Sequence, residues 1–345
     1  MKKLLALVLA LTMTLSITAC GGKSDEAPDA NASGGTQTEK TSDPIIVNIS
    51  HTYAESDQIN EELKIAQKNI EARTNGGVVV NLYPNGTLGN LIDGAEAVLS
   101  NSPLLLVTTY SSWEDVYYDA SALQCGFVFE DGEEFHKLME TELFAKLVED
   151  MDKVNVHALN SAFVGGMRHV IGKKAYSTPA DMKGLKLRVT NAAPYLECWQ
   201  AMGASPMGMA ASEQLSALSA GTVDALDQAI SQMYFTKSYE LAKHATLTGQ
   251  ELLADAMFCS TTWWNTLPAE YQEIIEEEVH DAGIRYSDYS AENEDAMRAE
   301  MEAAGVTFYE ADRQAFLDMG CGDLVLKYGI GQELLDTLAE IRAGN

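Results

Sequence analysis

The chain has 345 residues and is strongly acidic, with 51 Asp and Glu against 23 Lys and Arg and a net charge of −28 at pH 7. A protein of this charge is repelled by nucleic acid and by anionic membrane surfaces, which argues against both as binding partners. The length suffices for one large or two ordinary domains.

The N-terminus has the pattern of an export signal. Lys2 and Lys3 precede an apolar run at 4–16 that is too short to span a membrane. The segment Ile-Thr-Ala-Cys20 that follows resembles the lipobox of bacterial lipoproteins. Residues 1–20 are therefore predicted to be a lipoprotein signal peptide, with Cys20 as the lipid-bearing residue after cleavage. The alternative is an ordinary secretory signal with an incidental cysteine.

The composition changes near residue 44. Residues 21–43 contain no leucine, isoleucine, valine or aromatic residue and are expected to form a flexible tether. Beyond them, strand and helix patterns alternate, and the continuous apolar run at 104–109 is typical of a strand buried on both faces. This alternation predicts an α/β fold with mostly parallel strands. The expected strands are 45–50, 78–83, 104–109, 154–159, 185–189, 223–227 and 306–309, and the expected helices are 59–74, 91–99, 135–151, 193–202, 212–220, 268–304 and two at the C-terminus.

Sequence motifs for catalysis, metals or cofactors are absent. The chain has no Gly-x-Ser-x-Gly elbow, no His-Glu-x-x-His, no phosphate loop and no dinucleotide fingerprint, so no enzyme activity, metal or cofactor is expected. The cysteines beyond residue 20 are too far apart for a zinc or redox motif. Buried thiols are expected, with one long-range disulfide as the alternative, for Cys125, Cys198, Cys259 and Cys321.

Two arginines differ from the others because no acidic residue is near them in the sequence. Arg168 lies in the apolar, glycine-rich run 163–171, and Arg188 lies in the strand-like run 185–189. A planar guanidinium without a carboxylate neighbour suits bidentate capture of a small carboxylate ligand. The alternative is a structural arginine that pairs with a distant acid.

Several segments resemble one protein family. The segment Thr-Pro-Ala-Asp-Met-Lys-Gly-Leu-Lys-Leu-Arg-Val at 178–189 is similar to the signature of solute-binding proteins of tripartite ATP-independent periplasmic (TRAP) transporters, the DctP type. Further similarities extend the resemblance over roughly 45–340 in the same order and spacing. They lie at 83–89, 203–209, 215–224, 247–249 and 263–268.

The resemblance implies a two-lobed fold like that of periplasmic binding proteins. Two α/β lobes would be joined by crossing strands and a long helix spanning both, with the ligand in the cleft between them. The implied division places residues 44–165 and 254–293 in lobe I, and residues 166–253 and 294–345 in lobe II.

The resemblance also implies a binding site centred on Arg188, in the position where family members clamp the ligand carboxylate. Arg168 matches a second cleft arginine, and Gln228 replaces an asparagine that usually contacts the ligand. Two other departures put the identity of the ligand in doubt: Ala211 stands where many members have an aromatic residue, and Gly126 stands where proline is usual.

Strand-end geometry adds candidates from the first domain and from nearby loops. Side chains at the carboxyl ends of strands in an open α/β sheet face the ligand crevice. The loop after the first strand and the end of the buried strand are therefore expected to contribute. The candidate contacts from this geometry are His51, Thr52, Tyr53, Thr108, Thr109 and Tyr110. Met209, in the family-like segment 203–209, and Tyr234, soon after Gln228, are further candidates.

Together, these features and the resemblance suggest a lipid-anchored extracytoplasmic receptor that captures a small organic acid. The ligand would be a C4-dicarboxylate, a sugar acid such as a uronate, or a related hydroxy or keto acid. The receptor would deliver it to the small and large membrane subunits of a TRAP transporter and would touch the membrane only through its lipid. The alternatives are a ligand-sensing lipoprotein that acts on a signalling receptor and an extracellular hydrolase.

Overall fold

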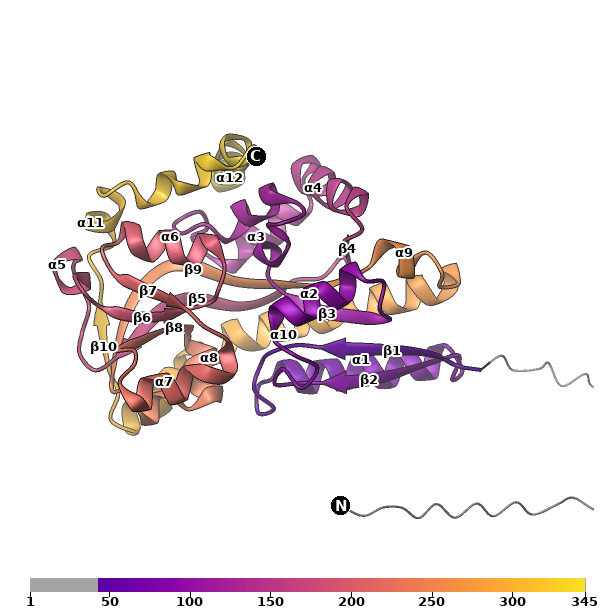
Figure 1. Cartoon of the computed structure of the whole chain (residues 1–345), viewed down its shortest axis with the longest axis horizontal. Coiled ribbons are helices and arrows are strands. Elements are labelled where there is room, and N and C mark those ends of the chain that lie inside the picture. Colours follow the sequence, from indigo (N-terminus) through magenta and orange to yellow (C-terminus); the bar gives the residue numbers. More distant parts are fainter. Residues whose placement is uncertain (1–42, 345) are drawn as a thin grey trace, which may run out of the picture. The chain divides into compact units, whose positions relative to one another are not determined.

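A ten-stranded mixed sheet organises the fold, in the order β2-β1-β3-β9-β5-β8-β6-β7, with β4 and β10 also pairing with β9 (Figure 1). The computed structural model describes residues 43–344. The strands are β1 (Ile45–Ser50), β2 (Val78–Tyr83), β3 (Leu104–Thr108), β4 (His157–Ala158), β5 (Phe163–Gly172), β6 (Lys186–Val189), β7 (Ser205–Gly208), β8 (Ala225–Ala229), β9 (His244–Cys259) and β10 (Thr307–Glu310).

Helices cover the sheet and connect most of its strands. The α-helices are α1 (Ile59–Arg73), α2 (Leu91–Leu99), α3 (Gly132–Met139), α4 (Glu142–Lys153), α5 (Pro179–Met182), α6 (Ala193–Ala201), α7 (Gln214–Ala220), α8 (Ile230–Thr236), α9 (Thr261–Trp264), α10 (Ala269–Ala303), α11 (Arg313–Leu317) and α12 (Gly331–Ala343). Short 3₁₀ helices lie at Tyr110–Trp113, Tyr118–Gln124, Ala211–Glu213, Ser238–Glu240 and Cys321–Lys327.

Strands β1, β2 and β3 form the parallel part that the sequence pattern predicted. Ile45 pairs with Val78, and Asn48 pairs with Leu104. Every residue of β3 is buried, as expected for a continuous apolar strand with both faces covered. The connections through α1 and α2 are the βαβ crossovers that parallel pairing requires.

The sheet is mixed, with five parallel and four antiparallel strand pairings among residues 43–344, and the long strand β9 runs antiparallel to β3, β4 and β5. Strand β5 is also antiparallel to β8. Sequence alternation of helix and strand does not reveal this, since β9 has 16 residues and extends through both parts of the sheet without a helical crossover.

Strand β5 carries two irregularities that surround the first of the two arginines. Its register against β9 shifts between Val164 and Gly166 and again between Arg168 and Val170. Gly166 has a φ of +91°, a conformation in which a side chain would be strained. Bulges of this kind redirect side chains and occur near functional sites.

Helix α10 is the 35-residue helix that the sequence predicted, and it packs against α1 and β5. Three ion pairs attach it to α1, one of them between Arg73 Nη2 and Glu277 Oε2 at 2.5 Å. Arg73 Nη1 lies 2.9 Å from Glu278 Oε1, and Arg285 Nε lies 2.7 Å from Glu62 Oε2. Helix α10 therefore supports the sheet along both of its parts.

The predicted single helix at 135–151 is instead two helices, α3 and α4. Thr141 separates them, because its side-chain oxygen accepts a hydrogen bond from the Phe144 N–H at 3.3 Å and caps the start of α4. Threonine is a good N-cap but a weaker helix former, so a new helix begins at this residue.

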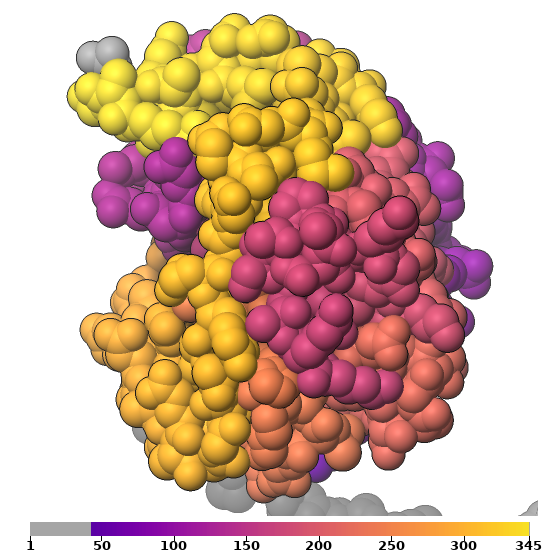
Figure 2. All heavy atoms as spheres, turned by 90° about the vertical axis from the view of Figure 1, so that its left-hand side faces the viewer, coloured from indigo at the N-terminus to yellow at the C-terminus, as the bar shows by residue number. Residues whose placement is uncertain are grey.

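The C-terminal helix α12 packs beside α3 and α4, which belong to the predicted lobe I (Figure 1). Its buried Leu334 and Leu338 share a hydrophobic cluster with Phe135 and Leu147. In the view of Figure 2 the C-terminal residues (yellow) cover the top of this face. The lobe boundaries stay a prediction, and α12 contacts the core of the lobe opposite to the one predicted for it.

The predicted signal peptide, Cys20 and the tether to residue 42 lie outside the described residues. Among residues 43–344, no helix is both long enough and apolar enough to cross a membrane. The thiols of Cys125, Cys198, Cys259 and Cys321 are free and buried, as the first of the two cysteine alternatives expected.

Candidate functional site

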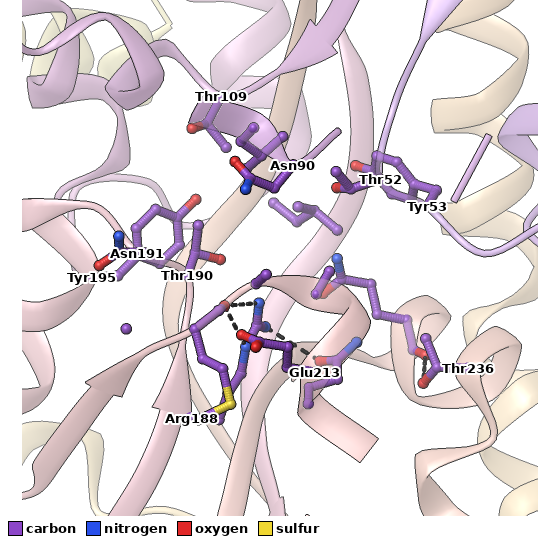
Figure 3. Close-up of a pocket in the computed structure, with 18 of the residues that line it drawn as sticks. Thr52, Tyr53, Asn90, Thr109, Arg188, Thr190, Asn191, Tyr195, Glu213 and Thr236 are labelled. Carbon is purple, nitrogen blue, oxygen red and sulfur yellow. Dashed lines mark hydrogen bonds between the residues drawn. The ribbon is translucent and has the colours of Figure 1, made fainter. Parts of the chain in front are cut away.

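A cavity of about 320 Å³ lies where the loop after β1 and the end of β3 meet the end of β6 and the loop before α7 (Figure 3). This volume is at the small end of the range for small-molecule sites. Most of its polar lining is uncharged, from Thr52, Tyr53, Asn90, Thr109, Thr190, Asn191, Tyr195, Gln214, Gln232 and Thr236. The charged lining residues are Asp57, Arg168, Arg188, Glu213 and Asp255.

Arg188 lies at the carboxyl end of β6 and lines this cavity although its side chain is 95% buried (5% exposed). Its Nε and Nη2 donate to the carbonyl oxygen of Met209 at 3.1 and 2.7 Å, and its Nη1 donates to Gln214 Oε1 at 3.2 Å. Within residues 43–344 it forms no ion pair. Burial, and then the charge of Arg168, lower the pKa of Arg188 to about 10, so it is still a cation at neutral pH.

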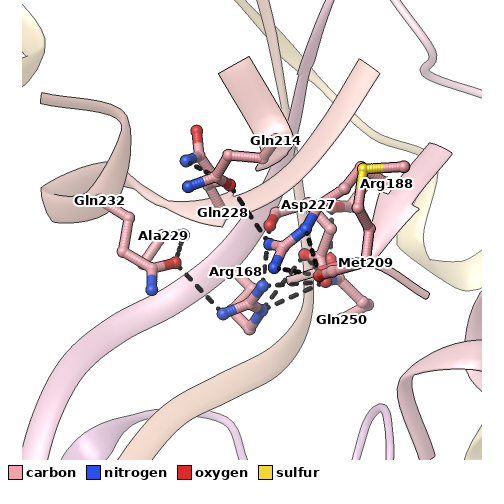
Figure 4. Close-up of polar contacts among 10 residues, drawn as sticks. Arg168, Arg188, Met209, Gln214, Asp227, Gln228, Ala229, Gln232 and Gln250 are labelled. Atoms are coloured by element: carbon pink, nitrogen blue, oxygen red, sulfur yellow. Dashed lines mark hydrogen bonds and ion pairs between the residues drawn. The ribbon is translucent and has the colours of Figure 1, made fainter. Parts of the chain in front are cut away.

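Arg168 lines the same cavity but is paired with Asp227, which is fully buried (Figure 4). Its Nη2 lies 3.1 Å from Asp227 Oδ2 and donates to the Asp227 carbonyl at 2.7 Å, and its Nε donates to Asp227 Oδ1 at 3.3 Å. The guanidinium also lies 5.3 Å from the centre of the Tyr195 ring. Arg168 thus pairs with an acid distant in the sequence, as the alternative expected, and its contact with a ligand stays a prediction.

Gln214 is held in place by a small amide network behind Arg188 (Figure 4). Its Oε1 accepts hydrogen bonds from Arg188 Nη1 and, at 3.1 Å, from Gln228 Nε2. The amide oxygen of Gln228 accepts a hydrogen bond from Ser238 at 2.6 Å. These bonds fix the orientation of the Arg188 fork, which is the preorganisation that anion recognition needs.

Two buried carboxyl groups line the cavity on the side of the loop after β1. The Tyr53 hydroxyl donates to Asp255 Oδ2 at 2.7 Å, and Asp57 Oδ1 accepts from the Ile59 N–H at 3.2 Å. Burial raises the pKa of Asp255 to about 6 and that of Asp57 to about 7. Figure 3 shows Tyr53 and Arg188 on different sides of the pocket. The site thus combines a guanidinium without an ion pair, neutral hydrogen-bonding groups and three carboxyl groups, those of Asp57, Asp255 and Glu213.

Residues 49–320 match the family model of the bacterial extracellular solute-binding proteins, family 7, the DctP family. The chain belongs to this family. A C4-dicarboxylate-binding periplasmic protein DctP from Rhodobacter capsulatus is 26% identical over 274 residues, which cover 78% of this chain and 81% of that protein.

Solved structures of TRAP periplasmic solute-binding proteins have the same fold. One from Desulfovibrio salexigens is 27% identical, with a TM-score of 0.83 over 88% of this chain and 99% of that one. One from Fusobacterium nucleatum is 29% identical, with a TM-score of 0.83 over 87% of this chain and 99% of that one. The predicted TRAP family and two-lobed fold are thereby confirmed, and the homologues are solute-binding receptors.

Six of the candidate contacts predicted for this DctP-family protein line the cavity: Thr52, Tyr53, Thr109, Arg168, Arg188 and Met209. They come from five separate stretches of chain, and β1, β3, β5, β6 and β7 with their following loops bring them together. Whether each touches a ligand stays a prediction.

Five other candidates are not among the residues that line the cavity, and whether they contact a ligand stays a prediction. Thr108 shares a hydrogen bond of 2.6 Å with Ser112, and Tyr110 is fully buried. Gln228 is turned toward Gln214 and Ser238 and acts behind the wall. His51 is buried with its ring edge-on to Tyr53, and burial lowers its pKa to about 4. The Tyr234 hydroxyl donates to Glu300 at 2.7 Å near the surface.

The sequence analysis missed Asn90, Gln214, Asp227 and Asp255. Asn90 had a local signal, since it caps α2 by accepting from the N–H groups of Ile92 and Asp93. Asp227 is the one charged residue of β8, which is otherwise apolar except for Gln228, and a charged residue in such a strand is usually paired when buried. Gln214 and Asp255 gave no such signal, because their roles depend on residues far away in the sequence.

Proposed function

We propose that this DctP-family protein is an extracytoplasmic receptor that binds a small organic acid through Arg188 and delivers it to the membrane subunits of a TRAP transporter. The observation that carries the proposal is the Arg188 guanidinium, which is buried in a cavity wall and has no ion pair within residues 43–344. Burying an unpaired charge is costly, and a ligand carboxylate would compensate that cost.

The geometry suits a carboxylate. Met209 and Gln214 accept hydrogen bonds from the guanidinium and fix its plane, and the cavity lies beside it. A bidentate arginine–carboxylate pair gives directional as well as electrostatic recognition. The net charge of −28 opposes an anionic ligand at long range, but salt screens that repulsion beyond about 8 Å. The attraction between a ligand carboxylate and Arg188 acts over a few ångströms and therefore outweighs this screened repulsion.

Relatives bind compounds of this kind. The Rhodobacter capsulatus protein is C4-dicarboxylate-binding, and a relative from Escherichia coli, 25% identical over 251 residues, is 2,3-diketo-L-gulonate-binding. The structures from Desulfovibrio salexigens and Fusobacterium nucleatum hold diglycerolphosphate and sn-glycerol-3-phosphate. All of these ligands are small oxyanions, which supports an anion site without deciding the ligand.

The remaining parts of the proposal concern anchoring and release. Cys20 would carry the lipid that holds the receptor at the membrane, and the ligand would leave chemically unchanged. Closure around the ligand would be a population shift driven by contacts made in the closed state.

A thermal-shift screen of organic acids tests the proposal. A ligand present at 100 times its Kd adds about 2.7 kcal/mol to the unfolding free energy. We expect at least one carboxylic acid to stabilise the protein by this amount and to be recovered unchanged after incubation. The absence of any stabilising acid, or the appearance of a reaction product, would contradict the receptor assignment.

A further inference from the structure

Although two arginines line the cavity, only one of them is available to balance the charge of a ligand. Arg168 is neutralised by Asp227, so Arg188 is the one cation of the described wall that lacks an ion pair. The same wall carries the carboxyl groups of Asp57, Glu213 and Asp255. A ligand with one negative charge can therefore pair with Arg188, whereas a second negative charge on the ligand would lie near carboxyl groups and be repelled by them.

Asp255 differs from the other carboxyl groups in its hydrogen bonding. It lies on β9, is 95% buried (5% exposed) and accepts a hydrogen bond from Tyr53 at Oδ2. Its Oδ1 has no hydrogen-bond partner within residues 43–344. A buried acceptor without a donor is rare in folded proteins and indicates that a donor is supplied from elsewhere. Because Asp255 lines the cavity, the ligand is a source of that donor.

The rest of the lining has the same preference. Thr52, Thr109, Thr190, Asn90 and Asn191 offer hydroxyl and amide groups that pair with ligand hydroxyls. They carry no charge and cannot neutralise a second acid group.

We infer that Asp255 is a specificity-determining residue, which accepts a hydrogen bond from a ligand hydroxyl and disfavours a second acid group. The ligand class is then a hydroxylated monocarboxylate, in preference to a dicarboxylate or a phosphate ester. This inference rests on the proposed function, since it takes Arg188 as the site of the single carboxylate.

The difference between the ligand classes follows from electrostatics in a buried site. A charged acceptor makes a stronger hydrogen bond to a hydroxyl than a neutral one does. Two carboxylates brought together in a place of low effective dielectric repel each other strongly. Replacing Asp255 by asparagine retains the size of the side chain and removes the charge, so it separates these effects from packing.

Isothermal titration tests this with defined probes: D-gluconate and D-glucuronate as hydroxylated monocarboxylates, and succinate and sn-glycerol-3-phosphate as dianions. At pH 8, where a carboxyl with a pKa of about 6 is ionised, we expect the wild-type protein to bind one of the monocarboxylates at least tenfold more tightly than either dianion. Asp255→Asn is expected to raise the Kd for that monocarboxylate about fivefold to tenfold and to reduce the ratio between the Kd values for succinate and for the monocarboxylate.

Two results would overturn the inference. One is a wild-type protein that binds succinate or sn-glycerol-3-phosphate as tightly as the preferred monocarboxylate. The other is an Asp255→Asn variant whose preference is unchanged. Asp281→Asn on the exposed side of α10 is the control, because it makes the same chemical change away from the cavity. Circular dichroism of each variant verifies its folding.

The test also separates this inference from the proposed function. If Arg188→Ala abolishes binding of every acid while Asp255→Asn leaves the preference unchanged, the receptor proposal survives and the role of Asp255 is refuted. If no acid binds the wild-type protein, or if Arg188→Ala binds as the wild type does, the proposed function itself has failed.

Discussion

Replacing Arg188 by alanine is the sharpest perturbation of the proposed site. The substitution removes the guanidinium that donates to Met209 and Gln214 and leaves a bound carboxylate without a partner in a buried place. Breaking a buried charge pair from one side costs about 3–5 kcal/mol. At 1.4 kcal/mol for each factor of ten, the Kd should rise roughly one hundred- to four thousandfold.

The assay is isothermal titration with the acid that gives the largest thermal shift. We expect the ligand-free stability of Arg188→Ala to stay near that of the wild type, because losing a charge that burial disfavours offsets the lost hydrogen bonds. Arg188→Lys is the matched variant, because it retains the positive charge without the planar, bidentate guanidinium. We expect its affinity for the acid to lie between those of the wild type and Arg188→Ala. A folded Arg188→Ala protein with near-wild-type affinity would refute the reasoning.

Three further predictions concern stability. Arg168→Ala should lower the unfolding free energy by about 3–5 kcal/mol, because it leaves fully buried Asp227 unpaired, and chemical denaturation with an unchanged midpoint would contradict this. Asp57→Asn should have a higher melting temperature than the wild type at pH 8, where the wild-type carboxyl is ionised and buried, and the same melting temperature at pH 4. Because burial raises the pKa of Asp57 to about 7, the contribution of this carboxyl to stability is full below pH 4 and is lost as the pH rises through 7. Equal melting temperatures of wild type and variant at pH 8 would contradict this destabilising effect of the ionised Asp57. Gly126→Ala should cost about 1–3 kcal/mol in urea unfolding, since a Cβ there would collide with Cys198 Sγ, and a neutral result would show that this contact relaxes.

The sequence predicted the fold well where the signal is local. The strands at Ile45–Ser50 and Val78–Tyr83 and the helix at Ala269–Ala303 agree with the structure almost residue for residue. Each is defined by hydrophobic period and by turn or capping residues beside it. Strand β9 was not predicted, because its direction and length depend on partners at distant positions along the chain.

The residues of the site were likewise predicted where the signal is local and missed where it depends on distant residues. Arg188 was placed at the carboxyl end of a strand, which alternation and position alone establish. The partner of Arg168 was missed, since Asp227 lies 59 residues away and meets it only through the antiparallel pairing of β5 with β8. Gln228, adjacent to Asp227 on the same strand, is turned to Gln214 and Ser238, a difference that no spacing rule reveals.

Strand β9 has a mechanical consequence for a receptor that must open and close. Its hydrogen bonds tie one end to β3 and the other to β5, so any rotation of one half against the other is absorbed as twist within a single stretch of backbone. If the receptor closes around a ligand as proposed, the twist that closure imposes on β9 would act to reopen the cleft.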